Sequence, residues 1–411
     1  MSALGSLSTA GPARWRRPPA GSTEGHGRGP EARALLAALR TGPAPIAGPR
    51  LGQLVAACDP AQLVGTVLAE GLAGPAHERL GHLLPPAERA RLAREAARDG
   101  ARHQAYLQLL GRLGAALDGA GLTWVVLKGP VLAELSYRGT PRGYTDLDLL
   151  VPAHQFRAAV EALREAGAAP ADQDWAQLVR VAKGEMNVAV HGAPMVDLHW
   201  HLVYLRSARE RWAVPTDDLL GRRRRTRLGA VDAWALDRED FAAHLALHAA
   251  SGAVQQLRRL LDVQRSTAHE PPDWEVLVRR CRAWRVGLPV SVMLHRAARA
   301  LGAAVPEEVV SELAGGPLNR ALVRRLGEWV PAGRLPGQRS VSNGLTRCLR
   351  DGLWSTGAEF AAGSAQALAE LLRLPSGSGA GRPAVPPGPG GLEGYLAMIE
   401  RSDRYGHLGR R

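Results

Sequence analysis

The chain has 411 residues, 45% of them hydrophobic and 22% charged, with a formal net charge of +13. This length provides material for two or three folded units, and the balance of hydrophobic and charged residues excludes a wholly disordered chain. No apolar run approaches the roughly 18 residues that a membrane-spanning helix needs, and the first residues lack the continuous apolar segment of a secretory signal. We therefore expect a soluble, cytoplasmic protein without a membrane span.

Neither the cysteines nor the choice between lysine and arginine indicates a particular metal or nucleic-acid partner. The three cysteines are far apart and form no CxxC pair, which argues against a disulfide framework and a thiolate zinc site. Only two of the 52 basic residues are lysines, Lys128 and Lys183. This preference for arginine is typical of a GC-rich bacterial genome, so the charge alone does not indicate a nucleic-acid partner. Lys128 stands out, because an ammonium and a guanidinium are not interchangeable.

The periodicity of the apolar residues divides the chain into five segments. Residues 1–30, rich in Gly, Pro and Ser, are predicted to be a disordered tail. Residues 31–118 have a helical period interrupted by breakers, and residues 119–205 alternate between strand and helix patterns. Residues 206–374 open with a hairpin pattern and continue as helices, whereas residues 375–411 are expected to form a flexible linker and tail. The pattern predicts a small α/β core flanked by N- and C-terminal helical regions.

Within residues 119–205 the order of elements is strand, helix, strand, helix and hairpin. The strands are short, apolar and bounded by Gly or Pro, and Pro130 suits the first turn of a helix. A second, Arg-rich hairpin is expected over residues 222–236, and the last twenty residues predict at most one short helix. The predicted core elements cover residues 122–127, 130–137, 146–151, 153–166 and 186–202.

The sequence DLDLLV contains two acids within one predicted strand. Because side chains alternate along a strand, Asp146 and Asp148 project to one face while Leu147 and Leu149 enter the core on the other. Two neighbouring carboxylates on a buried sheet repel each other and lose solvation, which favours a compensating cation. Mg²⁺ prefers one or two carboxylates together with waters and substrate phosphates. The motif alone leaves a second interpretation open, namely two acids at a strand end that face water.

Two neighbouring motifs favour the interpretation that Asp146 and Asp148 bind a cation. The pair Lys128-Gly129 ends one strand and begins a helix, where backbone amides can approach phosphate oxygens. The later strand VDLHWH carries a third carboxylate, Asp197, and strand alternation puts His199 and His201 on its face. Three acids that converge on one sheet edge are typical of a two-metal site.

The segments LKGPVLAELSYRGTPRGYTDLDLLV and VDLHWHL resemble the uncharacterised nucleotidyltransferase family of the DNA polymerase β-like superfamily. The resemblance extends over roughly residues 35–300 and is most specific in the central 80. It implies an α+β or α/β fold, in which a polymerase-β-like core with a small mixed sheet lies between helical regions. The later helix DREDFAAHLALHAASGAVQQLRRLLDV resembles the next family segment, with matches at His248, Arg258 and Asp262. The matching positions in the core are Lys128, Gly129, Arg142, Asp146, Asp148, Asp197 and His199.

The resemblance and the charges together predict a transferase. It would move a nucleoside monophosphate from an NTP to a hydroxyl of a small molecule, peptide or protein and release pyrophosphate, with Mg²⁺ or Mn²⁺ as cofactor. Asp146 and Asp148 would bridge the metals, and Asp197 would hold the metal that activates the acceptor hydroxyl. Lys128 and Arg142 would contact the triphosphate, and His199 would contact the substrate or support a ligand. ATP is one candidate nucleotide, and a nucleic-acid acceptor is not expected.

One departure from the superfamily pattern leaves two alternatives open. Many members have Gly-Ser or Gly-Gly where this chain has Gly129-Pro130, so a backbone N–H and a hydroxyl that could bind phosphate are missing. The chain could instead be a phosphotransferase that acts on the γ-phosphate at the same site, or a catalytically impaired nucleotide-binding partner protein.

Other candidate sites have weaker patterns. His191, His199 and His201 could form a zinc site, although such a cluster is more often the polar edge of a hairpin. His244 and His248 have helical spacing but lack the glutamate of HExxH, which favours core positions. Residues 222–225 are four consecutive arginines, either a solvated hairpin edge or a surface for an anionic ligand.

Overall fold

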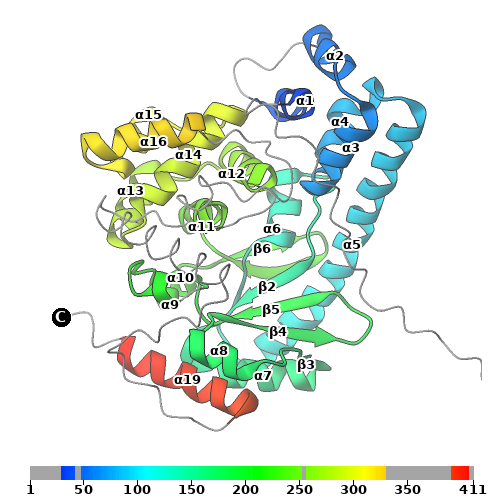
Figure 1. The fold of residues 1–411 in the computed structure, drawn as a ribbon. Helices are drawn as coiled ribbons and strands as arrows, with labels where there is room; N and C mark the ends of the chain where they lie inside the picture. Colours follow the sequence, from blue (N-terminus) through cyan, green and yellow to red (C-terminus); the bar gives the residue numbers. More distant parts are fainter. Residues whose placement is uncertain (1–28, 42–47, 205, 252–255, 330–389, 407–411) are drawn as a thin grey trace, which may run out of the picture.

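A seven-stranded mixed sheet organises the chain in the computed structural model, which describes residues 29–41, 48–204, 206–251, 256–329 and 390–406 (Figure 1). The strand order is β3-β4-β5-β2-β1-β7-β6. The pairs β2–β5 and β1–β7 are parallel, and the other neighbours are antiparallel. The strands are β1 Val125–Val126, β2 Asp146–Leu150, β3 Ala168–Pro170, β4 Glu185–Val190, β5 Met195–His199, β6 Arg224–Leu228 and β7 Val231–Ala235.

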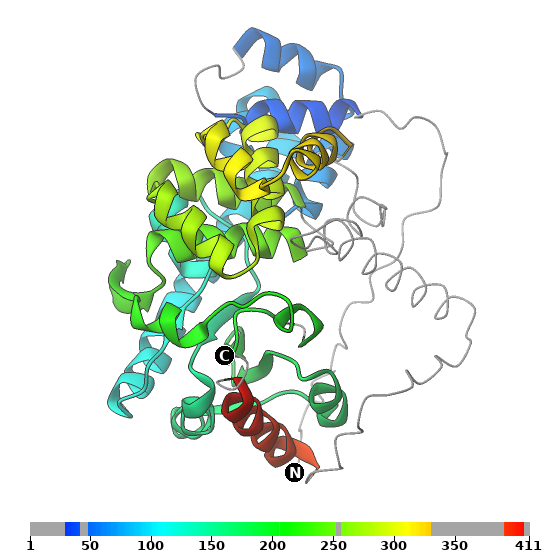
Figure 2. The same ribbon diagram turned by 90° about the vertical axis from the view of Figure 1, so that its left-hand side faces the viewer.

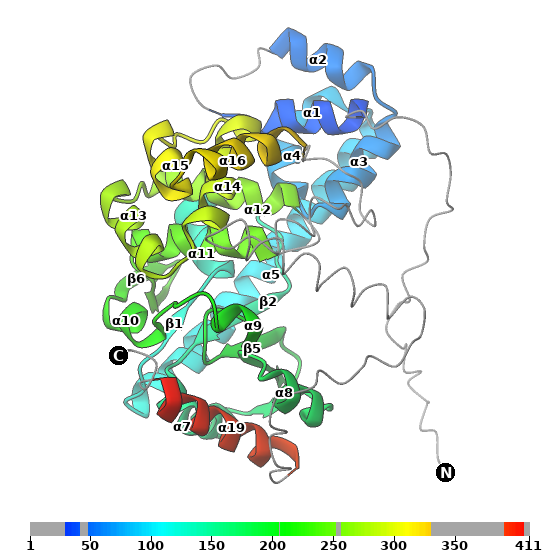
Figure 3. The same ribbon diagram turned by 60° about the vertical axis from the view of Figure 1, so that its left-hand side comes forward.

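Helices gather at both ends of the sheet. The long helix α5 extends from Pro86 to Gly119 and contacts α4, α7 and β7. Figure 2 shows α1–α4 together with the later helices α11–α16 at one end of the molecule, and α7, α8 and α19 lie at the other end (Figure 3). The N-terminal helices are α1 Pro30–Leu39, α2 Gly48–Ala56, α3 Pro60–Ala69, α4 Ala73–Leu80 and η1 Gly81–Leu83. The others are α6 Gly129–Val131, η2 Leu132–Tyr137, η3 Ala153–Gln155, α7 Phe156–Glu165, α8 Trp175–Val181, α9 Arg206–Arg209, α10 Thr216–Gly221, α11 Arg238–Ser251, α12 Gln256–His269, α13 Trp274–Ala283, α14 Gly287–Leu301, α15 Glu307–Ala314, α16 Pro317–Trp329 and α19 Gly391–Gly406.

The predicted order of core elements is confirmed, with differences in length. The strand predicted over residues 122–127 is only β1, two residues long, and the helix after it continues as the π-helical segment η2. The strand β3 and helix α8 lie between the predicted second helix and the hairpin and were not predicted. The hairpin β6–β7 joins the same sheet through the parallel pair β1–β7, so residues 224–235 extend the core sheet.

The C-terminal prediction differs more. Helix α19 has 16 residues, whereas the sequence predicted at most one short helix. The tail over residues 1–28, the helical pattern of residues 330–374 and most of the linker lie outside the described residues. No single described helix has the length and apolar content of a membrane span; only the bent pair α2 and α3, taken together, passes that test.

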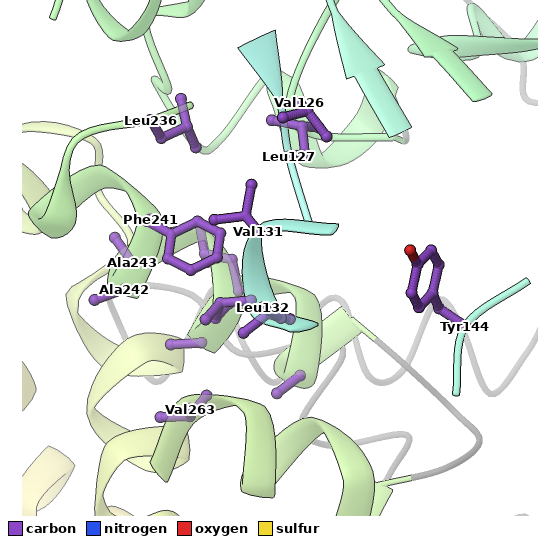
Figure 4. Close-up of a cluster of buried hydrophobic side chains, with 14 of the residues drawn as sticks. Val126, Leu127, Val131, Leu132, Tyr144, Leu236, Phe241, Ala242, Ala243 and Val263 are labelled. Atoms are coloured by element: carbon purple, nitrogen blue, oxygen red, sulfur yellow. The ribbon is translucent and has the colours of Figure 1, made fainter. Parts of the chain in front are cut away.

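The turn after β1 is packed against the C-terminal helices. Val131 and Leu132 point toward Phe241 of α11 and the neighbouring buried side chains (Figure 4). A Cβ atom on Gly129 would lie 2.8 Å from the ring of Tyr144, so glycine is needed for this close approach. The turn that carries Lys128 is therefore fixed by packing on both sides.

A buried ion pair connects the loop before β2 to α12. Arg142 donates from Nε and Nη2 to the two carboxylate oxygens of Asp262, at 2.8 and 2.7 Å. The hydroxyl of Tyr137 donates to the same carboxylate at 2.8 Å. Because all three side chains are buried, loss of the carboxylate would leave a buried guanidinium without its counter-charge.

We expect Asp262→Ala to lower the free energy of unfolding by about 3–5 kcal/mol, because it leaves the buried charge of Arg142 uncompensated. The matched control is Asp232→Ala, which breaks an exposed ion pair with Arg227 and should cost about 1 kcal/mol or less. Urea unfolding measures both. Equal, small losses for the two variants would contradict the structural role of the buried pair.

Candidate functional site

The two predicted acidic strands are direct neighbours in the sheet. Strands β2 and β5 are parallel, with Asp148 in register with Asp197 and Leu150 with His199. The ligand atoms of Asp148, Asp197 and His199 all lie within 4.8 Å of one another. The structure therefore brings together three residues that the sequence singled out, from two strands about 50 residues apart in the chain. Asp146 does not belong to this group.

Asp148 is held by an ammonium group and an imidazole. The ammonium of Lys128 lies 2.8 Å from Asp148 Oδ1, and His199 Nε2 lies 3.1 Å from the same oxygen. Burial alone would raise the pKa of Asp148, which is only 2% exposed, but Lys128 and His199 lower it well below its ordinary value. Asp148 is therefore a buried carboxylate that stays charged.

Lys128 reaches Asp148 because β1 runs antiparallel to β2. The amide of Leu127 donates to the backbone oxygen of Asp148 at 3.0 Å, which puts the next residue beside the acidic side chains. Burial lowers the pKa of Lys128, but the charges of Asp148 and Asp146 outweigh it and the pKa is raised. The one lysine that the sequence singled out thus carries the positive charge of the site.

Glu185 is a site residue that the sequence analysis missed. It opens β4 in register with His199, and its Oε2 lies 3.2 Å from His199 Nδ1. Burial lowers the pKa of His199, whereas Glu185 and Asp148 raise it, and the net shift is upward. Glu185 belongs to no recognisable motif, and the only signal was its position on the hairpin opposite the Asp-x-His strand.

The other two aspartates, Asp146 and Asp197, are half-buried. Burial, then Glu185 and Asp148, raise the pKa of Asp197 to about 7. Burial and Asp148 also raise the pKa of Asp146, against the opposing charges of Lys128 and Arg142. The site therefore carries more negative charge than its own cations balance.

Two oxygens of the site fit a divalent cation. Asp148 Oδ2 and Asp197 Oδ1 are buried and have no hydrogen-bond partner. Carboxylate oxygens are the ligands that Mg²⁺ and Mn²⁺ prefer. In addition, the Glu185 carboxylate lies at ion-pair distance from His199 Nδ1, which has no hydrogen-bond partner, on the ring nitrogen that does not face Asp148. The donor set of Asp148, Asp197 and His199 is thus suited to one such ion.

Two arginines near the site, Arg142 and Arg258, have different partners. Arg142 is committed to Asp262, whereas Arg258 donates to the backbone oxygen of Gly143 at 2.8 Å and keeps a buried Nε without a partner. Arg142 and, to a smaller extent, Arg258 lower the pKa of Asp146, against the larger effects of burial and Asp148. Of these two arginines, Arg258 is therefore the one that keeps a buried guanidinium nitrogen without a partner.

The three-histidine zinc alternative is not supported in the described part of the chain. Strand β5 ends at His199, and His201 lies in the following turn, where its Nδ1 accepts from the amide of Val203 at 2.9 Å. Neither His191 nor His201 joins the group of ligand atoms around Asp148. The expectation that strand alternation extends to His201 is therefore wrong.

The other two weak candidates have internal partners or are buried. Among the four arginines of residues 222–225, Arg222 pairs with Asp240 and Arg224 with Glu270. The guanidinium groups of the other two lie over the ring of Trp234, at 4.5 and 5.1 Å from its centroid. His244 is buried, and burial followed by the charge of Lys128 lowers its pKa to about 3.

Comparison with known proteins shows the family of the chain. The family model described as "uncharacterised nucleotidyltransferase" matches residues 57–302, and the chain belongs to this family. The matched region contains all seven strands and ends at the C-terminus of α14. No curated protein matches. Among solved structures, the chain is similar to JHP933 from Helicobacter pylori, with 14% identity and a TM-score of 0.25, over 55% of this chain and 94% of the other.

We expect Asp148→Asn and Asp197→Asn each to weaken Mn²⁺ binding by about 100-fold, because each removes one charge and one ligand oxygen. Glu185→Gln should weaken it about 10-fold, as loss of a partner behind a ligand does. Electron paramagnetic resonance of free Mn²⁺ measures the affinities, and Asp232→Asn, an exposed acid, is the control. Wild-type affinity in both aspartate variants would exclude this metal site.

Proposed function

We propose that the protein is a Mg²⁺- or Mn²⁺-dependent nucleotidyltransferase with a polymerase-β-like core, which acts in the cytoplasm. It would transfer a nucleoside monophosphate from an NTP to a hydroxyl of a small molecule, peptide or protein. The observation that carries the proposal is the pair Asp148 and Asp197, in register on adjacent parallel strands, each with a buried oxygen that lacks a partner. Membership of a nucleotidyltransferase family supports it.

The roles follow from the positions of the charges. A divalent ion held by Asp148, Asp197 and His199 would lower the pKa of the acceptor hydroxyl and offset the charge of the triphosphate. We assign Asp146, which begins the same strand two residues before Asp148, to a second ion. The acceptor oxygen would attack the α-phosphorus in line and expel pyrophosphate. The protein would contribute position and preorganised charge.

The assignment of the phosphate-binding residues changes in one respect. Arg142 binds Asp262 through two nitrogens, and we assign it to positioning of the loop before β2. Lys128 and Arg258 are the cations that border the acidic cluster, and we assign both to the triphosphate. Pro130 occupies the first turn of α6 and offers no N–H, so these side chains would supply the phosphate contacts that the superfamily takes from its backbone.

Labelled nucleotides test the proposal and separate it from the two alternatives. The protein is incubated with Mg²⁺ and each of the four NTPs, labelled either at the α- or at the γ-phosphate, in the presence of a panel of hydroxyl acceptors. Transfer of the α-label with release of pyrophosphate supports nucleotidyl transfer. Transfer of the γ-label would show a phosphotransferase. Binding of NTP without any transfer would show an impaired nucleotide-binding protein.

We expect Asp148→Asn with Asp197→Asn to reduce transfer by about 1,000-fold or more, because metal-ion stabilisation of the transition state is worth several kcal/mol. Asp146→Asn alone should also reduce the rate but leave the tighter Mn²⁺ site intact, since Asp146 is outside the group of three ligands. Circular dichroism checks folding. Unchanged transfer by the double variant would refute the carboxylate assignment.

We expect Arg258→Met to raise KM for the NTP about 10-fold, because a charge-assisted hydrogen bond contributes about 1.5–3 kcal/mol. Mn²⁺ affinity without nucleotide should not fall in this variant. Arg227→Met, which removes an exposed arginine of the β6–β7 hairpin, is the control. An unchanged KM would remove Arg258 from the phosphate site.

A further inference from the structure

The C-terminal helix α19 packs against helices α7, α8 and η3 of the core although it lies outside the region matched by the family, residues 57–302. It lies at the end of the molecule opposite the C-terminal helices α11–α16 (Figure 3). Arg157 of α7 forms ion pairs with Glu393 and Glu400 of α19, both at 2.8 Å. The helix is thus held by charged groups on its surface as well as by its apolar face.

Tyr395 is the residue of α19 that reaches deepest. Its side chain is fully buried, and its ring packs against Phe156 and Trp175 with centroid distances of 6.2 and 6.0 Å. Its hydroxyl lies 2.7 Å from the backbone oxygen of Lys183 and 2.9 Å from that of Glu185. The indole N–H of Trp200 donates to the same hydroxyl at 3.0 Å. One phenol therefore contacts the start of β4 and the residue that follows β5.

These contacts fall on Glu185 itself and on Trp200, the residue after His199. Glu185 and His199 are in register, and Trp200 directly follows His199. A shift of the backbone at Glu185 would move its carboxylate relative to His199 Nδ1, and His199 in turn contacts Asp148. Partners of this kind fix the orientation of a metal-binding imidazole.

Backbone contacts also hold this corner of the hairpin, since the oxygen of Gly184 accepts from the amides of Trp200 and His201, and Tyr395 adds a side-chain contact to it. The chain enters β4 through Ala182, whose φ of 43° is in the left-handed region that L-residues seldom adopt. Gly184 is held by the backbone oxygen of Tyr204, but the backbone oxygen of Glu185 is bound by the Tyr395 hydroxyl. The phenol is therefore a specific restraint on the residue that orients His199.

We propose that helix α19 is part of the working site and that Tyr395 is a positioning residue, which sets the Glu185–His199 contact through its hydroxyl. The inference rests on the proposed function, because the contact matters for activity only if His199 supports a metal ion. It also means that the site extends beyond the region shared with the family and depends on a segment nearly 200 residues later in the chain.

Tyr395→Phe in the full-length protein tests the inference, because it keeps the ring and removes only the hydroxyl. The first readout is the imidazole signal of His199 in ¹⁵N-resolved NMR spectra, assigned with His199→Gln. We expect this signal to shift in Tyr395→Phe. The second readout is Mn²⁺ affinity, which we expect to fall about 10-fold, as for other residues that orient a ligand.

The control is the double variant Glu393→Gln with Glu400→Gln, which removes the ion pairs of α19 but leaves the Tyr395 hydroxyl in place. It should lower the melting temperature without moving the His199 signal or the Mn²⁺ affinity. An unchanged His199 signal in Tyr395→Phe, or an equal change in the control, would overturn the positioning role. Absence of Mn²⁺ binding by the wild type would instead refute the proposed function, and the NMR result would still decide whether Tyr395 positions His199.

Discussion

The structure depends on a buried negative charge, the carboxylate of Asp148. A charge with 2% of its residue exposed is tolerable only when cations and hydrogen bonds compensate for lost solvation, and here Lys128 and His199 do so. The two partners come from the turn after β1 and from the end of β5, so the charge connects three neighbouring strands. The two-residue strand β1 pairs with β2, and this pairing positions Lys128, two residues after β1, beside Asp148.

The helices on either side of the sheet act on the same site. Arg142 and Tyr137 bind Asp262 of α12, and Arg258 of the same helix binds the backbone next to Arg142. The C-terminal helices thus fix the loop that leads into β2 and bring a guanidinium to its acidic end. At the opposite end of the molecule, α19 contacts the hairpin that supplies Glu185 and His199. Both helical regions therefore contact segments that carry residues of the site.

The core of the site could be predicted from the sequence because it follows from strand alternation. Asp146 and Asp148 alternate with Leu147 and Leu149, and the same period of two relates Asp197 to His199. The sequence predicted that three acids converge on one sheet edge, and the structure pairs β2 with β5 and brings Asp148 and Asp197 together, with Asp146 outside their group. His201 shows the limit of the argument, because alternation holds only as far as the strand, and the strand ends at His199.

The sequence by itself determined the family, the order of the core elements, and the lysine and aspartates that meet at the sheet edge. Only the tertiary structure decided that Arg142 is bound by Asp262, that Glu185 lies behind His199, and that Tyr395 reaches the hairpin from the end of the chain. The physical reason is the distance along the chain between the residues that interact. Alternation and turn formation depend on neighbouring residues and leave a pattern in the sequence. An ion pair or hydrogen bond between residues more than 100 positions apart is set by packing of the whole fold, and it leaves no such pattern.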